Sequence, residues 1–199
     1  MARDLKRKRE KVALADLDIV NPYYRSGDSR DELEEAGVRL IISPFANTNL
    51  DAPALPQEMY AVVDDRSLSC IVDVGGDDRG ALALGRLSPS ILEEDDYEMY
   101  LVINRFRPLT RDPGAVLTVM REIEEAGHLP FTAVINNSNL GAGTTPEDVL
   151  SSVAFAEETA RVCGLPLRAT AVDEALMEDL EGKIGNLFPL RLQKRPVSL

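Results

Sequence analysis

The chain has 199 residues, of which 44% are apolar, and its formal net charge is −12. This length and composition suit one compact domain with a hydrophobic core. The acidity argues against broad nucleic-acid binding, because affinity for phosphates depends on lysine and arginine. His128 is the only histidine, so zinc sites and histidine-based catalytic triads have almost no ligands available.

Three features bear on the cellular location. The N-terminus is basic, and we interpret residues 3–11 as a solvated helix end, with contact to DNA or an anionic membrane as the alternative. No run approaches the roughly 20 apolar residues that a membrane-spanning helix needs. The only cysteines, Cys70 and Cys163, are not clustered, which favours a reducing compartment over a disulfide framework. We expect a cytoplasmic protein without a transmembrane segment.

Short apolar runs alternate with helical segments along the chain. The apolar runs predict strands at Val12–Asp16, Val38–Ile42, Ser69–Val74, Glu98–Asn104, Phe131–Asn136, Leu167–Val172 and Leu187–Leu192. The helical segments are Asp28–Glu35, Pro56–Asp64, Arg79–Arg86, Pro113–Ala126, Pro146–Cys163 and Asp173–Gly182. This alternation predicts an α/β fold, with a mainly parallel sheet and helices on both faces, in a single domain over residues 1–199.

Two of these helices have clear end signals. Thr145 supplies a capping hydroxyl, Pro146 occupies the first turn, and Asp148 places a carboxylate there. Gly127 and Gly164 lie where a left-handed residue ends a helix.

Polar residues and glycines collect at the ends of four predicted strands. They are Asp16, Asp18, Asp73, Gly75, Gly76, Asn104, Asn136 and Asn137. Because ligands of open parallel sheets bind beyond the carboxyl ends of the strands, these residues predict one site at that edge.

The residue types suit a magnesium nucleotide. Mg²⁺ prefers oxygen ligands, keeps several waters and needs few carboxylates. Asp16 and Asp18 are two residues apart, so in an extended segment their side chains face the same way. Gly75 and Gly76 allow backbone N–H groups to approach a terminal phosphate. The alternative is that each aspartate only caps the element that follows it.

The segment VALADLDIVNPYYRS resembles the D-x-D region of MinD/ParA/CobQ-type ATPases, a SIMIBI-class branch of the P-loop NTPases. IVDVGGDDRGA is similar to their Walker B strand and switch glycine, and LVINRFRP to the strand whose asparagine reads adenine. The similarity extends from about Val12 to Leu192. It implies a P-loop NTPase-like fold that binds Mg²⁺ and ATP or ADP.

The resemblance also assigns roles to individual residues. It implies that Asp18 orients the attacking water and that Asp16 lies near the magnesium ion. Asp73 matches the Walker B carboxylate, and Gly76, next to Gly75, matches the contact to the terminal phosphate. Asn104 matches the adenine-reading asparagine.

Further residues are candidates by position. Asn136 and Asn137 are additional candidates on the side of the base. Residues 21–25 fall where family members have a mobile or partner-facing segment.

One motif of the family is absent from the sequence. The Walker A pattern G-x-x-x-x-G-K-[ST] does not occur, and the only Gly-Lys pair, Gly182-Lys183, is followed by Ile184. In the family this phosphate loop precedes D-x-D, so we expect the sequence to be a fragment without its first strand and phosphate loop. The loss of the loop amides and lysine should weaken ATP binding by several kcal/mol.

Three function classes remain open at this point. The first is an ATPase domain that hydrolyses ATP only with its Walker A segment. The second is a non-catalytic interaction or regulatory module derived from such an ATPase. The third is transferase or ligase chemistry, as in CobQ-like relatives, although no Cys–His glutaminase pattern is visible. The resemblance leaves a homodimer or an unknown protein partner open.

Overall fold

The computed structural model describes residues 1–17, 29–42, 57–76 and 78–192. These residues form two compact units. The first unit contains Met1–Tyr97 together with Ile123–Leu129, and the second contains Glu98–Glu122 together with Pro130–Leu199. Each unit has its own parallel sheet.

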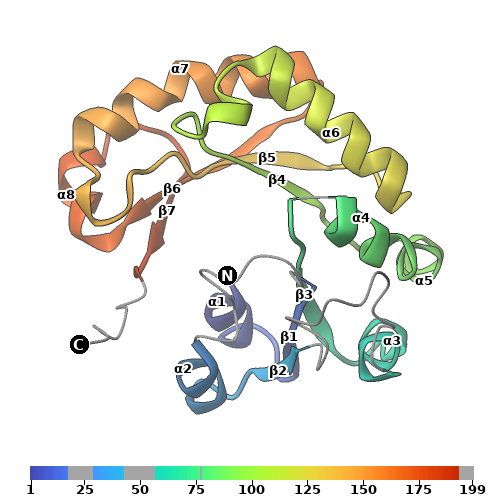
Figure 1. The fold of residues 1–199 in the computed structure, drawn as a ribbon. Helices are drawn as coiled ribbons and strands as arrows, with labels where there is room; N and C mark the ends of the chain where they lie inside the picture. Colours follow the sequence, from blue (N-terminus) through green and yellow to red (C-terminus); the bar gives the residue numbers. More distant parts are fainter. Residues whose placement is uncertain (18–28, 43–56, 77, 193–199) are drawn as a thin grey trace, which may run out of the picture. The chain divides into compact units, whose positions relative to one another are not determined.

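The first unit is built on a three-stranded sheet (Figure 1). Its elements are α1 (Ala2–Lys6), β1 (Val12–Asp16), α2 (Arg30–Glu35), β2 (Arg39–Ile42), α3 (Gln57–Asp64), β3 (Ser69–Asp73), α4 (Asp78–Gly85) and α5 (Ser88–Glu94). The strand order is β2-β1-β3, and both pairings are parallel. Strand β1 is therefore central, and all five of its residues are buried.

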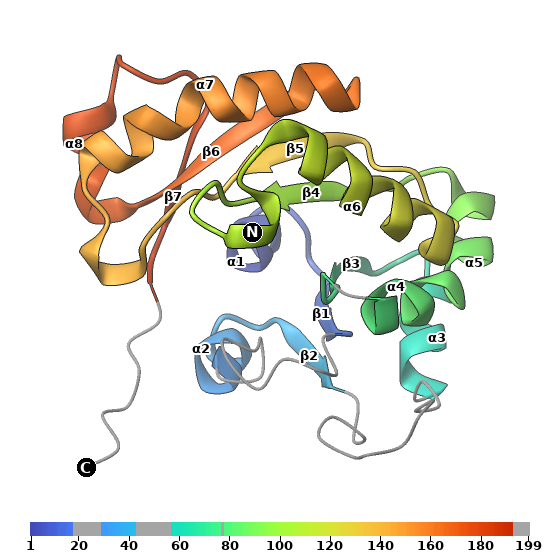
Figure 2. The ribbon, with the colours of Figure 1, turned by 45° about the horizontal axis from the view of Figure 1, so that its top comes forward.

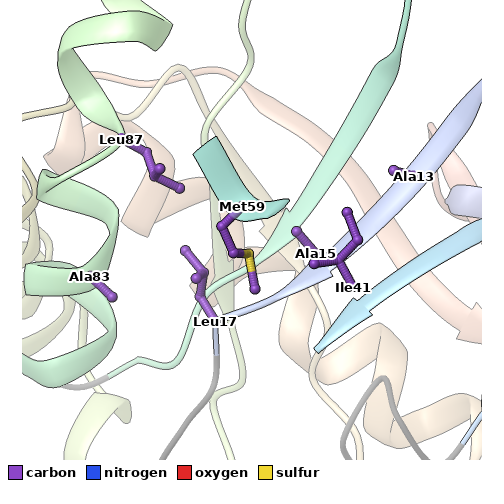
Figure 3. Close-up of a cluster of buried hydrophobic side chains, with 7 residues drawn as sticks. All are labelled: Ala13, Ala15, Leu17, Ile41, Met59, Ala83 and Leu87. Atoms are coloured by element: carbon purple, nitrogen blue, oxygen red, sulfur yellow. The ribbon is translucent and has the colours of Figure 1, made fainter. Parts of the chain in front are cut away.

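Helices cover both faces of this sheet because β1 is apolar on both sides. Ala13 and Ala15 pack into one cluster with side chains such as Met59 of α3 (Figure 3). Val12 and Leu14 pack into a second cluster that includes Leu33 of α2. A continuous apolar run is what a parallel strand between two helical layers requires.

The second unit is built on a four-stranded sheet with the order β4-β5-β6-β7, all parallel. Its elements are β4 (Tyr100–Ile103), η2 (Pro108–Thr110), α6 (Pro113–Gly127), β5 (Ala133–Asn136), η3 (Gly141–Gly143), α7 (Pro146–Cys163), β6 (Leu167–Asp173), η4 (Glu174–Leu176), α8 (Met177–Leu180) and β7 (Leu187–Leu190). Helix α6 ends in the first unit.

Helix α7 is the main support of the second sheet. It packs against β5 and β6 (Figure 2), and its Val149 joins Val172 of β6 and Leu180 of α8 in a buried cluster. The Thr145 hydroxyl accepts a hydrogen bond from the Asp148 amide, and the Asp148 carboxylate accepts one from the Thr145 amide, which completes a capping box.

The predicted α/β class with mainly parallel strands and flanking helices is confirmed. Val12–Asp16 and Pro146–Cys163 have the predicted bounds, and Gly164 ends α7 in the left-handed conformation with φ 69°. The prediction of one domain over residues 1–199 stays a prediction beside the two compact units.

Two local predictions were wrong, and one helix was missed. Asp173 ends β6 instead of starting a helix, and only the short η4 and α8 follow it. Helix α5 was not predicted, although Ser88-Pro89 is a helix-start signal. The left-handed residue after α6 is His128, with φ 52°, and Gly127 remains helical.

Candidate functional site

Asp16 and Asp73 lie next to each other at the carboxyl edge of the first sheet. They are the last residues of β1 and β3 and are register partners, so their side chains leave the sheet on the same face. The Leu17 amide donates a hydrogen bond to the Asp73 carbonyl at 2.8 Å, which continues the pairing past both residues. Asp16 is 3% exposed, Asp73 is half-buried, and each has an interaction partner in the protein.

The glycines that follow β3 differ in their surroundings. Gly75 is buried, and a Cβ atom on Gly80 of α4 would lie 2.4 Å from the Gly75 carbonyl oxygen. Only glycine at position 80 allows this approach of the helix to the backbone. Gly76 is exposed, and among the described residues no atom beyond its own chain neighbours lies within 4 Å of the place where its Cβ would be. The backbone at Gly76 is therefore open to a ligand.

The rest of the predicted metal and water site lies outside the described residues. This applies to Asp18, the predicted water-orienting residue, and to residues 21–25. Within the described part of the chain, no group of three or more His, Cys, Asp or Glu side chains is arranged to hold a metal ion. Asp16 and Asp73 alone provide two carboxylates, which is enough for a Mg²⁺ ion that keeps most of its waters.

Asn104 and Asn136 both lie at the carboxyl edge of the second sheet. Asn104 directly follows β4, and Asn136, the last residue of β5, is the register partner of Ile103. Asn104 Nδ2 donates to the Asn139 carbonyl at 3.1 Å, and Asn104 Oδ1 accepts from the Phe106 amide at 3.0 Å. Both ends of this amide therefore hold the backbone of neighbouring loops.

Asn136 is fully buried and also has both ends of its amide occupied. Its Nδ2 donates to the Ser152 hydroxyl of α7 at 2.9 Å, and its Oδ1 accepts from the Ser138 amide at 3.2 Å. This side chain joins β5 to α7 and fixes the start of the loop after β5.

Asn137 is the predicted base-side residue that borders a cavity. The cavity has a volume of about 20 Å³ and lies at the carboxyl ends of β5, β6 and β7. Its lining includes Asn137, Ser138, Asn139, Thr144 and Asp173. A space of this size holds about one water molecule.

The structure thus brings the predicted residues together in two groups. Asp16, Asp73, Gly75 and Gly76 belong to the first unit, and the three asparagines belong to the second. Sequence reasoning missed Gly80, although it is the next glycine in the segment VGGDDRG. It also missed Ser152, whose only signal is its place on the first turns of α7.

Comparisons with known proteins add little to this geometry. No family model and no curated protein matches the chain. Among solved structures, the chain is similar to a mutant of D-threo-3-hydroxyaspartate dehydratase, with 15% sequence identity and a TM-score of 0.40. The match covers 96% of this chain and 54% of the dehydratase chain, so this chain spans about half the length of that protein.

The lengths and compositions of the helices bear on whether the chain could cross a membrane. Across the described ranges, none of them combines the length and the apolar composition that crossing a bilayer requires.

Proposed function

We propose that this chain is an ATP- and Mg²⁺-binding domain of the MinD/ParA/CobQ type, which hydrolyses ATP only together with a Walker A segment. The observation that carries the proposal is the register pairing of Asp16 and Asp73 at the carboxyl edge of a parallel sheet. In this proposal the two carboxylates bind waters of the hydrated Mg²⁺ ion, and Asp18 orients the attacking water.

The glycines after β3 support the phosphate side of the proposal. Gly75 is held under α4 by its contact with Gly80, while Gly76 faces open space. A backbone that is fixed on one side and open on the other can direct N–H groups at a phosphate without rearrangement. The terminal phosphate would therefore approach Gly76.

The position of β3 in the sheet supports the proposal that ATP hydrolysis needs a Walker A segment. The family resemblance implies a strand with the phosphate loop beside the Walker B strand, which β3 would be. Among the described strands, β3 pairs only with β1, although its residues are apolar on both faces. An added strand on that side would supply the loop amides and the lysine that the phosphates need.

The base side of the proposal rests on the resemblance alone, which assigns adenine reading to Asn104 and the side of the base to Asn136 and Asn137. In the structure the amides of Asn104 and Asn136 hold neighbouring loops and α7. Asn137 borders a cavity that holds about one water molecule, and its Oδ1 accepts a hydrogen bond from Asn139 Nδ2 at 3.3 Å. We further propose a cytoplasmic location, which suits Cys70 and Cys163, neither of which is in a disulfide.

The alternative function is a non-catalytic interaction or regulatory module derived from such an ATPase. The internal hydrogen bonds of Asn104 and Asn136 favour it, because each amide already uses one donor and one acceptor inside the protein, and Asn136 is also fully buried.

Calorimetric titration with MgADP and MgATP distinguishes the two functions. The 199-residue chain should bind weakly and show no ATP turnover. The same chain, extended at its N-terminus by a strand, Walker A loop and helix from a MinD/ParA-type ATPase, should bind MgADP in a magnesium-dependent manner. Asp73→Asn should weaken that binding at least about tenfold, since it removes one carboxylate charge beside the ion.

A matched control is Asp65→Asn, which removes an exposed carboxylate from the loop before β3. It should leave nucleotide affinity unchanged. Magnesium-dependent turnover by the 199-residue chain would refute the requirement for Walker A. An extended chain that folds but binds no nucleotide would favour the interaction module.

A further inference from the structure

Among the strands that the structure describes, β3 is the last one of the first sheet. Its backbone hydrogen-bonding groups alternate between the side of β1 and the opposite side. The Ser69 amide donates to the Lys11 carbonyl at 3.0 Å, and the Asp73 carbonyl accepts from the Leu17 amide. Residues 69, 71 and 73 therefore direct their backbone groups toward β1. In an extended strand the next residues point the opposite way, so Cys70 and Val72 direct theirs away from the sheet.

The side chains of β3 are those of an interior strand. Cys70 and Val72 pack into the cluster on one face, and Ile71 packs into the cluster on the other. All five residues of β3 are only half-buried, whereas β1 is buried throughout. The strand has no lysine, proline or bulge, which are the features that normally protect an edge from pairing.

The edge of β3 is complementary to itself. If two copies meet in antiparallel orientation with a two-fold axis at Ile71, Cys70 of each copy lies opposite Val72 of the second copy. These are the residues whose N–H and C=O groups point outward, so they form two hydrogen-bonded residue pairs around Ile71. A two-fold arrangement of this kind uses the same surface on both subunits.

The charges on β3 do not oppose this arrangement. Asp73 is the only charged residue of the strand, and in the pair it lies opposite Ser69 of the second copy. The two Asp73 residues are four positions apart along the strand direction, which is roughly 13 Å. At that distance two partly solvated carboxylates are largely screened.

We propose that β3 pairs in antiparallel orientation with β3 of a second copy, so that two three-stranded sheets join into one. The pairing extends over few residues, so the dimer is weak and concentration-dependent. It does not depend on nucleotide. A strand carrying a Walker A loop would compete with the second copy for the same edge.

Sedimentation velocity over a range of protein concentrations, without nucleotide, tests this pairing. Val72→Pro removes the outward N–H of residue 72 and leaves the bonds of residues 69, 71 and 73 to β1. It should weaken dimerisation at least about tenfold. Val72→Ala shortens the side chain but keeps the N–H, so it serves as the matched control and should still dimerise. Circular dichroism checks that both variants are folded.

A disulfide tests the register. Opposite residues in a hydrogen-bonded antiparallel pair have Cα atoms about 5.5 Å apart, within the range for a disulfide. Val72→Cys should therefore form a disulfide with Cys70 of the second copy under mild oxidation. The double variant Val72→Cys, Cys70→Ser should lose this cross-link. A wild-type chain that is monomeric at all concentrations, equal dimerisation of the Pro and Ala variants, or cross-linking that survives Cys70→Ser would overturn the proposal.

Discussion

The carboxyl edges of the two sheets are constructed in different ways. At the first edge, after β1 and β3, α4 lies against the backbone because Gly80 has no side chain to separate it from Gly75. At the second edge, after β4 and β5, side-chain amides hold the loops through hydrogen bonds, as Asn104 and Asn136 do. Substitutions that add atoms should therefore destabilise the first edge, and substitutions that remove hydrogen-bonding atoms should destabilise the second.

The difference also separates the chemistry of the two edges. Asp16 and Asp73 bring two carboxylates together beside an open backbone at Gly76. Asn104 and Asn136 have their polar atoms engaged inside the protein. In the proposed function, metal binding therefore belongs to the first edge, while at the second edge Asn137 borders a small cavity.

The largest expected effect is at the second edge. Asn136→Ala removes the hydrogen bonds to Ser152 and Ser138 at a fully buried position and leaves a cavity. The free energy of unfolding should fall by about 3 kcal/mol, measured by urea denaturation. Asn137→Ala, one residue further on, should cost less than about 1 kcal/mol. Equal losses for the two variants would contradict the supporting role of Asn136.

Adding a methyl group at position 80 tests how closely α4 packs at the first edge. Gly80→Ala places a carbon atom against the Gly75 carbonyl and should destabilise the protein by about 2 kcal/mol. Gly76→Ala, where the space is open, should change stability by less than about 0.5 kcal/mol. Thermal unfolding of both variants measures the difference, and a Gly80→Ala protein as stable as wild type would show that α4 is not held in this way.

The support of the second edge extends to the start of α7, the helix that carries Ser152. Thr145→Ala removes the hydroxyl that accepts from the Asp148 amide, and it should cost about 1 kcal/mol of unfolding free energy. Ser151→Ala, in the second turn of the same helix, is a control that leaves the capping box intact. A loss in the control as large as that in Thr145→Ala would argue against the cap.

The smallest effect is a dependence on pH. Hydrogen bonds from the Thr145 amide and hydroxyl lower the pKa of Asp148 below its ordinary value of 3.8. A carboxyl group with a lowered pKa in the folded state stabilises the protein above its ordinary pKa, and this contribution is lost as the pH falls through the folded-state pKa. Below pH 3.8 the wild type should therefore lose more stability than Asp148→Asn, in urea melts at matched pH. Equal losses of stability in the wild type and in Asp148→Asn would show that the Asp148 carboxylate does not cause the pH dependence.

The sequence predicted those parts of the fold whose signals are local. Strand β1 was predicted because its apolar run is continuous, and α7 because Thr145, Pro146 and Gly164 mark its ends. The helix predicted at Asp173–Gly182 failed because Asp173 is equally suited to end a strand and to accept from the Ala175 amide. Such a choice depends on pairing with β7, which is not visible in the local sequence.

For the candidate site, the sequence predicted that Asp16 and Asp73 are neighbours but not the contacts made by the other residues. The order of strand ends was enough to place Asp16 beside Asp73. The engagement of Asn136 with Ser152, 16 residues further along the chain, depends on how α7 packs on β5. The need for glycine at position 80 likewise depends on the approach of α4 to Gly75. Both the Asn136–Ser152 hydrogen bond and the need for glycine at position 80 depend on contacts between elements, which the local sequence does not reveal.

Binding of Mn²⁺, used as a paramagnetic substitute for Mg²⁺, tests the central claim about the first edge most directly. Electron paramagnetic resonance should show Mn²⁺ bound together with ADP in the chain extended by a Walker A segment. Asp73→Asn should weaken this binding at least about tenfold, and Asn104→Ala should leave the metal affinity unchanged. Equal Mn²⁺ binding by wild type and Asp73→Asn would show that the paired carboxylates of β1 and β3 are not the metal site.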